Sequence, residues 1–581
     1  MAKIYTQKND EEERSNMMIL TTQEKIHDYS TRGWWGTKTI QHYLQTIVDR
    51  SPNKEAVIDP ANKASLCRTP LYALTYQELQ YKIDQLATAL YENGIGKDDI
   101  VAIQLPNIVE LVVSYFAILK VGAISSPIPI QFREFECLQL LQSLNAKAVI
   151  TLLEINDRQY ATMYAQLQPQ VPSLQTIFTL DEPIDDCVVI DFEKQSIHQL
   201  PNIAVTANDI FTICWTSGTE GKPKGVPRSH NEWFVSAYAS VDAAKLTAND
   251  RILLTFPLVN MAGIGGVLVP WILSGGTLVL HHPFDFPTFL AQIGTQRITY
   301  TLVPPSLLAV MIKNEAILSG IDIGALRAIG TGSAPITSWL IHSWKDLHGV
   351  DLINYFGSNE GATFLSDAED VPDPQLRAIY LPRFGPKELS WHNRVGKMVE
   401  SKLIDVDTGE EITEPNHPGE LLIRGPGVFS GYWQAPELNT KAFDEEDYFH
   451  TGDLFEIIRD HGEDRYYRVV GRLKDIIVRS GMKISPLEIE EIIQTHPSIV
   501  EVAVIPFPHR THGEISCACV VLAQEQTITL EEIINLLTDK KIASFKLPEK
   551  LMIVDTLPRN AVGKVMKSAL IDQVVDEEVG A

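Results

Sequence analysis

The sequence predicts an α/β protein, with a large N-terminal part built from βαβ units and a compact α+β unit at the C-terminal end. From about residue 31 to about residue 470, short runs of β-branched residues alternate with segments of helical periodicity, which is typical of an open α/β sheet. Beyond Gly471, two amphipathic segments and two strand-like runs fill about 110 residues, enough for a separate core. No charged residue occurs from Ile252 to Phe284, as expected of strands buried on both faces of a parallel sheet.

In the N-terminal part, each expected strand is a short apolar run. These runs are IVAIQL (100–105), KAVITLL (147–153), RITYTLV (297–303) and LRAIG (326–330). A helix is expected over residues 74–94, where apolar residues recur at helical spacing. The charge-free run is long enough to imitate a membrane span, but prolines and glycines interrupt it, so we interpret ILLTF and TLVL as buried strands on either side of a helix.

The C-terminal unit begins with SPLEIEEIIQTH (485–496), an amphipathic helix. We expect Ser485 to be its N-cap and Glu488, three residues later, to complete a capping box. The runs 500–507 and 516–523 are expected strands, and 529–545 is an expected helix. The predicted organisation is a flexible arm over 1–30, an N-terminal domain over 31–473 and a C-terminal domain over 474–581.

Composition restricts the partners and the compartment. The formal net charge of −25 repels phosphate backbones, so nucleic acid is not expected as a partner, and no basic membrane-binding patch is evident. The six cysteines include no CxxC pair. Cys517 and Cys519 alternate in a strand-like run, and we interpret them as buried thiols, with a metal or redox pair as the alternative. This usage fits a reducing cytosol, and no apolar segment of signal-peptide length begins the chain.

The first stretch that carries chemistry is WTSGTEGKPKGV (215–226). Glycines and small hydroxyl residues let backbone N–H groups converge on an anion, and Lys222 and Lys224 add positive charge. The spacing differs from that of a P-loop. The stretch indicates phosphate binding, with a flexible surface turn as the alternative.

The second stretch, NYFGSNEG (354–361), follows the apolar run VDLI. It therefore comes just after a strand end, where ligands bind in open α/β sheets. Glu360 could hold Mg²⁺, which prefers oxygen ligands and substrate phosphates; alone, it could equally be a solvated loop acid.

Three further stretches lie toward the C-terminus. In YFHTGDL (448–454) and in GRLKDIIVRSGMKISP (471–486), Asp453 and Arg472 could accept from and donate to ribose hydroxyls. Alone, an Asp after Thr-Gly is usually a turn residue. In LPRNAVGKVMK (557–567), Gly563 and Lys564 offer a loop that delivers one ammonium, although alone this would be an ordinary basic turn.

In this order and spacing, the five stretches closely resemble the superfamily of acyl-CoA synthetases, peptide-synthetase adenylation domains and firefly luciferase. The resemblance runs from about Gly33 to Ser568, and weaker marks at 74–79, 119–123 and 332–335 agree with it. Within the superfamily the chain is most similar to bacterial CoA ligases for short, medium-chain or cyclic carboxylic acids. The runs 474–490 and 557–567 carry that closer likeness.

The resemblance implies a large multi-sheet N-terminal domain, a small mobile C-terminal domain and an active site between them. It implies that a carboxylic acid and ATP form an acyl-adenylate and pyrophosphate, and that coenzyme A then takes the acyl group and releases AMP. ATP, Mg²⁺ and coenzyme A are the implied cofactor and co-substrates. The alternative is an acyl- or aryl-adenylate synthase that loads a carrier protein in trans. The oligomeric state is open, with a homodimer among the options.

The resemblance also assigns residues position by position. The residues expected to wrap the ATP phosphates are Thr216, Ser217, Gly218, Thr219, Glu220, Gly221, Lys222 and Lys224. Those expected to border adenine are Gly332, Ser333, Ala334, Tyr355, Phe356 and Gly357. Glu360 would hold Mg²⁺, Asp453 and Arg472 would bind ribose, and Lys564 would touch both the carboxylate and the α-phosphate. Lys474 would be the hinge, the Gly481 loop would line the thiol channel, and Asn260, Met261 and Gly263 would line the acid pocket.

The chain departs from the family pattern at several of these positions. Glu220 and Asn359 each replace a common Thr, and Asn260 replaces a frequent gating His or aromatic residue. The stacking position beside adenine falls to Phe356. The apolar character of 256–266 and 330–335 favours an aliphatic, alicyclic or aromatic acid over a charged one.

Overall fold

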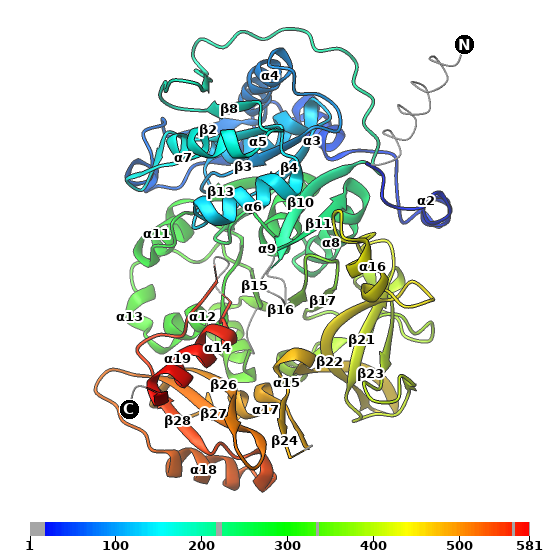
Figure 1. Ribbon diagram of the computed structural model, residues 1–581, viewed down its shortest axis with the longest axis vertical. Helices are drawn as coiled ribbons and strands as arrows, with labels where there is room; N and C mark the ends of the chain where they lie inside the picture. The colour runs from blue at the N-terminus through cyan, green and yellow to red at the C-terminus, as the bar shows by residue number, and fades with distance from the viewer. Residues whose placement is uncertain (1–17, 217–222, 333–335, 481, 561–563, 580–581) are drawn as a thin grey trace. The chain divides into compact units, whose positions relative to one another are not determined.

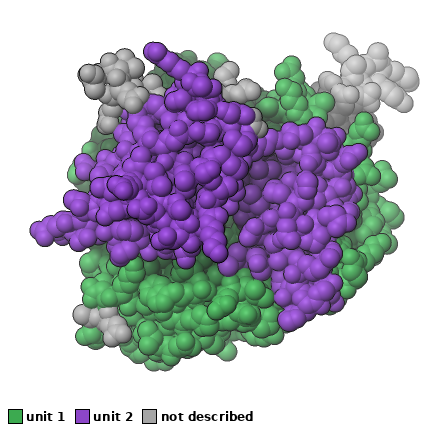
Figure 2. Space-filling model, turned by 90° about the horizontal axis from the view of Figure 1, so that it is seen from below, with its two compact units in different colours: residues 1–378, 384–400, 424–447 green, residues 379–383, 401–423, 448–581 purple. Residues whose placement is uncertain are grey.

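The computed structural model describes residues 18–216, 223–332, 336–480, 482–560 and 564–579. The chain forms two compact units (Figure 2). Unit 1 comprises residues 1–378, 384–400 and 424–447, and unit 2 comprises residues 379–383, 401–423 and 448–581. The fold is mixed α/β with several sheets, as predicted (Figure 1).

Unit 1 contains a seven-stranded sheet that is parallel except for its edge strand β11. In spatial order its strands are β11 (Lys224–Ser229), β10 (Ile210–Thr216), β4 (Ile124–Pro127), β3 (Ile100–Ile103), β5 (Ala148–Thr151), β8 (Thr176–Thr179) and β9 (Val188–Val189). The run expected at 100–105 is β3 and that at 147–153 is β5. Both strands are completely buried, as parallel strands covered on both faces should be.

An eight-stranded sheet, parallel through its six inner strands, completes the framework of unit 1. Its strands in order are β17 (Thr363–Ser366), β16 (Asp351–Gly357), β15 (Ala328–Gly332), β14 (Tyr300–Leu302), β12 (Arg251–Leu254), β13 (Thr277–Leu280), β1 (Glu55–Ile58) and β2 (Ala73–Thr75). A small antiparallel pair joins β6 (Glu154–Ile155) to β7 (Arg158–Gln159).

The helices of unit 1 connect and cover these strands. They are α2 (Gln23–Thr31), α3 (Ile40–Arg50), α4 (Tyr76–Glu92), α5 (Val109–Lys120), α6 (Glu134–Leu144), α7 (Tyr160–Leu167), α8 (His230–Ala243), α9 (Met261–Gly263), α10 (Val269–Ser274), α11 (Phe286–Thr295), α12 (Pro305–Lys313), α13 (Glu315–Leu318), α14 (Ser338–His348), α15 (Pro374–Ile379) and α16 (Pro436–Ala442). The predicted helix over 74–94 is α4, and Thr75 and Glu78 form a capping box at its start. Part of the segment expected as an arm forms α2.

The charge-free run from Ile252 to Phe284 folds as predicted. It contains residues 252–254 of β12, then α9, a π-helical turn η3 (Ile264–Leu268) and α10, and finally β13. Both strands and the π-helical turn are buried. Among the described residues, no helix has both the length and the apolar character that crossing a membrane requires.

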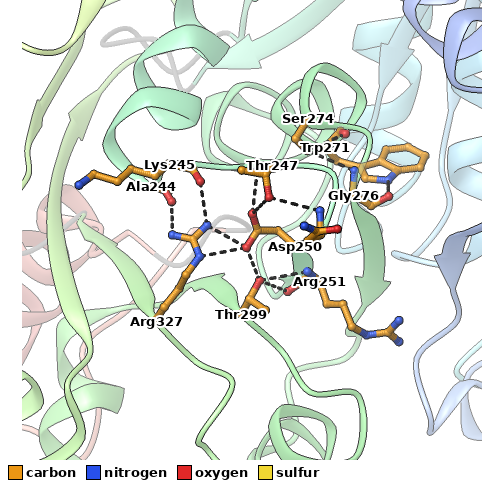
Figure 3. A network of polar contacts seen from close by, with 11 residues as sticks. Ala244, Lys245, Thr247, Asp250, Arg251, Trp271, Ser274, Gly276, Thr299 and Arg327 are labelled. Atoms are coloured by element: carbon orange, nitrogen blue, oxygen red, sulfur yellow. Dashed lines mark hydrogen bonds and ion pairs between the residues drawn. The ribbon is translucent and has the colours of Figure 1, made fainter.

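One polar network joins the amino ends of three neighbouring parallel strands (Figure 3). Asp250, Thr299 and Arg327 immediately precede β12, β14 and β15. The Asp250 Oδ1 accepts hydrogen bonds from Thr299 Oγ1 at 2.7 Å and from Arg327 Nη2 at 2.8 Å. Arg327 also donates to the carbonyl oxygens of Ala244 and Lys245, just after α8. The network therefore fixes strand register at the edge opposite the carboxyl ends.

Unit 2 contains a six-stranded sheet and a five-stranded sheet. The six strands in order are β18 (Tyr380–Pro382), β23 (Glu463–Arg472), β22 (Phe449–Asp460), β21 (Gly419–Arg424), β19 (Glu400–Ile404) and β20 (Glu411–Ile412). The five strands are β25 (Met482–Ile484), β24 (Ile477–Arg479), β27 (Gly513–Leu522), β26 (Ile499–His509) and β28 (Lys550–Ile553), with β28 pairing β27. Helices α17 (Pro486–Ile493), α18 (Leu530–Asp539) and α19 (Lys567–Val579) alternate with the strands of the five-stranded sheet along the chain.

The C-terminal α+β domain has its own core, as the sequence predicts. Two hydrophobic clusters draw their buried residues from the span between Ile477 and Val574. Cys517 and Cys519 are fully buried in one of these clusters, facing the same side of β27. The predicted domain border at residue 473 remains a prediction.

The capping box predicted for α17 is wrong. Ser485 is the N-cap of α17, but its side chain makes no capping hydrogen bond. The Ser485 hydroxyl instead donates to the carbonyl oxygen of Val470, and the Glu488 carboxylate pairs with Lys546 Nζ at 2.6 Å. Tertiary partners have taken both side chains away from the helix end.

Candidate active site

The glycine-rich stretch is anchored by two antiparallel strands. Strand β10 ends at Thr216 and β11 begins at Lys224, and these two residues face each other in the register. Both side chains are half-buried. Six of the predicted phosphate-binding residues, Ser217, Gly218, Thr219, Glu220, Gly221 and Lys222, lie outside the described residues. The pairing brings the two ends of the predicted phosphate loop together.

Asn359 connects the loop after β16 to two other parts of unit 1. Its Nδ2 donates to the carbonyl oxygen of Trp215 at 3.4 Å, at the end of β10. Its Oδ1 accepts a hydrogen bond from the backbone N–H of Met261 at 2.7 Å. The end of β10, the loop after β16 and the start of α9 therefore meet at this one amide; β10 and β11, which flank the predicted phosphate loop, are called the phosphate strands below. A threonine, the usual residue here, has a shorter side chain without an amide donor.

A buried arginine is bonded to the backbone of the same loop. Arg228 has no exposed surface, and its guanidinium donates to the carbonyl oxygens of Asn359 and Gly427, both at 2.8 Å. It also lies 4.7 Å from the ring centroid of Trp233. Burial lowers the pKa of Arg228, while Glu232 and Glu360 favour its charged form. Arg228 was not among the predicted site residues, although its position as the one charged residue between Lys224 and Glu232 is a signal that could have identified it.

Glu360 follows Asn359 and is held at both its side chain and its backbone. The Tyr432 hydroxyl donates a hydrogen bond to Glu360 Oε1 at 3.1 Å, and Phe429 N donates to the Glu360 carbonyl oxygen at 2.9 Å. Lys224 Nζ lies 5.1 Å from the ring centroid of Tyr432. Burial, together with the Glu360 carboxylate, raises the pKa of Tyr432 well above its usual value, so the hydroxyl stays a donor.

The Glu360 carboxylate has the chemistry of a magnesium ligand. Mg²⁺ is commonly held by one or two carboxylates together with substrate phosphates. Among the described residues, no group of three or more His, Cys, Asp or Glu side chains is arranged to enclose a metal ion. A half-buried carboxylate beside the phosphate strands therefore fits an Mg²⁺ ion that is shared with a nucleotide.

The three predicted acid-pocket residues lie at the start of α9. Asn260 is the N-cap, and its Oδ1 accepts from the backbone N–H groups of Ala262 at 3.1 Å and Gly263 at 3.3 Å. A Cβ on Gly263 would lie 2.3 Å from the carbonyl oxygen of Pro257, so only glycine fits there. The π-helical turn η3 follows directly, and such turns are frequent at functional sites.

The predicted adenine-binding residues lie on two neighbouring strands. Gly332 on β15 pairs with Tyr355 on β16. The Tyr355 hydroxyl forms a hydrogen bond with the Tyr300 hydroxyl at 2.7 Å, so the Tyr355 side chain joins β16 to β14 within the sheet. Burial raises the pKa of Tyr355. The Phe356 ring contacts Phe364 edge to face, and Gly357 is exposed. Ser333 and Ala334 lie outside the described residues.

The remaining predicted residues belong to unit 2. Asp453 on β22 and Arg472 on β23 face each other in the register and form an ion pair, with Arg472 Nε 3.1 Å from Asp453 Oδ1. Asp453 is buried, whereas Arg472 is exposed. Lys474 lies in the 3₁₀ turn η5 (Leu473–Asp475). Lys564 is exposed, and its backbone N–H donates to Asn560 Oδ1 at 2.9 Å. Gly481 lies outside the described residues.

Comparisons with known proteins identify the family to which the chain belongs. Residues 44–433 match the model of the AMP-binding enzyme family, and residues 488–564 match the model of the AMP-binding enzyme C-terminal domain. The chain is 31% identical to a medium-chain fatty-acid–CoA ligase of Escherichia coli K12, over 96% of this chain and 94% of that protein. It is 30% identical to a vibriobactin-specific 2,3-dihydroxybenzoate-AMP ligase of Vibrio cholerae, over 93% and 95% of the two chains.

Among solved structures, ATP-bound MatB from Rhodopseudomonas palustris is similar to this fold. The TM-score is 0.77 at 25% identity, and the match covers 93% of this chain and 99% of that one. The family model spans more than half of the chain, and the relatives match almost all of it. The chain belongs to the family of AMP-binding enzymes.

Proposed function

We propose that this chain is an ATP-dependent carboxylate–CoA ligase. In the first step, a carboxylate oxygen of the acid attacks the α-phosphorus of ATP, an acyl-adenylate forms and pyrophosphate leaves. In the second step, the thiol of coenzyme A attacks the acyl carbonyl, the thioester forms and AMP leaves. The observation that carries the proposal is the hydrogen bond from Asn359 Nδ2 to Trp215 O. This bond joins the loop that contains Glu360 to the end of β10, where the predicted phosphate loop begins.

The first step joins two anions, so preorganised positive charge is the main requirement. Lys224 and the backbone around 217–222 hold the phosphates, and Lys564 neutralises the carboxylate and the α-phosphate. When bound at Glu360, Mg²⁺ supplies Lewis-acid charge to the phosphate oxygens. Asp453 and Arg472 bind the ribose. Their ion pair supports this role, because it holds an acceptor and a donor side by side.

The organic acid binds near the start of α9, beside Asn260, Met261 and Gly263. The apolar surroundings of that segment support an aliphatic, alicyclic or aromatic acid, and Ile264 and Leu258 are both fully buried there. Between the two steps, the C-terminal domain, residues 474–581, turns about Lys474 to bring the Gly481 loop to the thiol. The six cysteines are all free thiols, which supports work in the reducing cytoplasm.

A second candidate is an adenylate synthase that loads a carrier protein. The observation that favours this candidate is the 30% identity to the Vibrio cholerae relative, which is named as an AMP ligase for 2,3-dihydroxybenzoate. The two candidates share the first step and differ in the thiol that accepts the acyl group.

A panel of acids tests the proposal and separates the two candidates. The purified chain is incubated with ATP, Mg²⁺, coenzyme A and each acid, and AMP and acyl-CoA are quantified by mass spectrometry. We expect AMP and acyl-CoA to form in equal amounts with apolar acids. Adenylate without thioester for every acid would favour carrier loading, and no AMP with any acid would refute both candidates.

A further inference from the structure

We propose that Tyr432 is a positioning residue that holds the Glu360 carboxylate and the Lys224 ammonium ready for a metal–nucleotide complex. This inference rests on the proposed function, in which Glu360 holds Mg²⁺ and Lys224 contacts phosphate. Tyr432 lies outside the five stretches that the sequence analysis selected, and 72 residues separate it from Glu360 along the chain.

The backbone of Tyr432 is fixed by one side chain. Asn439, on α16, accepts from Tyr432 N at 2.7 Å through Oδ1 and donates to Tyr432 O at 3.1 Å through Nδ2. Gly431 has a φ of +131°, and a Cβ there would lie 2.9 Å from Asn439 Nδ2. The Asn439 amide therefore bonds both the N–H and the carbonyl oxygen of Tyr432, and the absence of a side chain on Gly431 permits this close approach.

Two backbone hydrogen bonds tie the segment around Tyr432 to the loop after β16 and to β11. Phe429 N donates to the carbonyl oxygen of Glu360, and Trp433 N donates to the carbonyl oxygen of Gly225, both at 2.9 Å. One short segment is thus bonded to the residue after Asn359 and to the residue after Lys224. This geometry places Tyr432 between the two charged groups without relying on its own side chain.

The side chain then makes a different contact with each charge. The hydroxyl donates to Glu360 Oε1 at 3.1 Å, which orients the carboxylate. The centroid of the ring lies 5.1 Å from Lys224 Nζ, within the range in which an aromatic ring attracts a cation. A phenylalanine would keep the ring and lose the hydroxyl, so the two contacts can be separated by substitution.

The test is calorimetric titration of nucleotide binding at several Mg²⁺ concentrations, with Tyr432→Phe, Tyr432→Leu and wild-type protein. For Tyr432→Phe, we expect the Mg²⁺ concentration that gives half-maximal ATP binding to rise about tenfold, because a hydrogen bond to a charged group is lost. ATP binding without metal should be unchanged. Tyr432→Leu should in addition weaken metal-free ATP binding, because Lys224 loses the ring.

A matched control is Tyr76→Phe, which removes a hydroxyl that donates to Gly276 O at 2.7 Å, at the amino end of β13. It should lower the melting temperature without moving the Mg²⁺ midpoint. In the Glu360→Ala background, Tyr432→Phe should have no further effect on that midpoint.

An unchanged Mg²⁺ midpoint in folded Tyr432→Phe would overturn the proposal, and so would an equal loss of ATP binding with and without metal. If wild-type protein activates no acid, the proposed function fails, but the titration still tests Tyr432 because it needs no acid.

Discussion

The backbone N–H of Met261 donates to Asn359 Oδ1 at 2.7 Å, so a residue beside the phosphate strands also secures the helix start that we assign to the acid pocket. Asn260 satisfies the next two N–H groups of the same helix. The three free donors at the start of α9 are thus taken by two asparagine amides. Both asparagines stand where the family pattern has other residues, so these departures support each other.

Asn359→Ala should therefore impair acid binding more than its position beside phosphate suggests. The variant leaves Met261 N without its acceptor and weakens the start of α9. We therefore expect the KM for the acid to rise about tenfold, because the loss of one hydrogen bond costs about 1.4 kcal/mol, which corresponds to a factor of about ten. Asn359→Asp keeps an acceptor for Met261 N, and should instead raise the KM for ATP by adding negative charge. Steady-state kinetics with both substrates varied checks this. Equal effects of the two variants on both KM values would contradict it.

Arg327→Met should reduce stability without altering catalysis. Asp250 is buried, and the substitution removes two guanidinium hydrogen bonds to Asp250 Oδ1 as well as those to the carbonyl oxygens after α8. We expect a loss of about 1–3 kcal/mol in apparent unfolding free energy, measured by urea denaturation. Both KM values should stay at wild-type levels, because the network lies at the amino ends of the strands. The control Arg68→Met, which removes an exposed ion pair with Glu182, should leave the urea midpoint in place. A changed KM for Arg327→Met would show that the network reaches the site.

Stability should fall in mild acid because of His230. Burial lowers the pKa of His230 from 6.5 to about 4, and its Nδ1 accepts a hydrogen bond from Ile40 N at 3.3 Å, which requires the neutral ring. In the unfolded chain the pKa of His230 is about 6.5, so the stabilisation by the neutral buried ring is complete above that pH. It is lost as the pH falls toward about 4, the pKa of His230 in the folded protein. The loss is at most about 3 kcal/mol.

Urea midpoints measured between pH 7 and pH 4.5 check this. His230→Phe should lower the midpoint at pH 7 and make it less dependent on pH, while His461→Gln, which removes an exposed ring, should keep the wild-type slope. Burial also lowers the pKa of His282 to about 4, so some slope should remain in His230→Phe. A slope unchanged in His230→Phe would exclude the buried ring as its source.

Lys564→Ala should separate the two half-reactions. The lysine is assigned to the first step alone, so we expect adenylate formation to fall by about 10²–10³. Thioester formation from a supplied acyl-adenylate should stay close to wild type. Lys540→Ala, which removes another exposed lysine of the same domain, should affect neither step. Equal losses in both steps would contradict the assignment.

Local patterns predicted the framework well. The apolar run VDLI predicted a strand, although β16 continues to Gly357 and so includes the first four residues of the stretch that was expected just after the strand end, and the helix α4 followed from periodicity. These features depend on neighbouring residues, which a single sequence displays directly. The capping pattern failed at Ser485, where a carbonyl oxygen 15 residues earlier competes for the hydroxyl.

The supporting residues of the site could not be predicted in this way. Arg228 reaches Gly427 across 199 residues, and Tyr432 reaches Glu360 across 72. Such contacts depend on how the chain brings distant loops together, and no local spacing records them. The motif residues could be selected from the sequence because glycines, lysines and acids cluster within short stretches.

The most direct test of the account is the exchange of labelled pyrophosphate into ATP. The exchange measures reversal of the first step, and needs neither coenzyme A nor a carrier protein. We expect label to enter ATP only when both Mg²⁺ and a suitable apolar acid are present. Folded protein that exchanges no label with any acid of the panel would contradict the claim that this chain activates carboxylates.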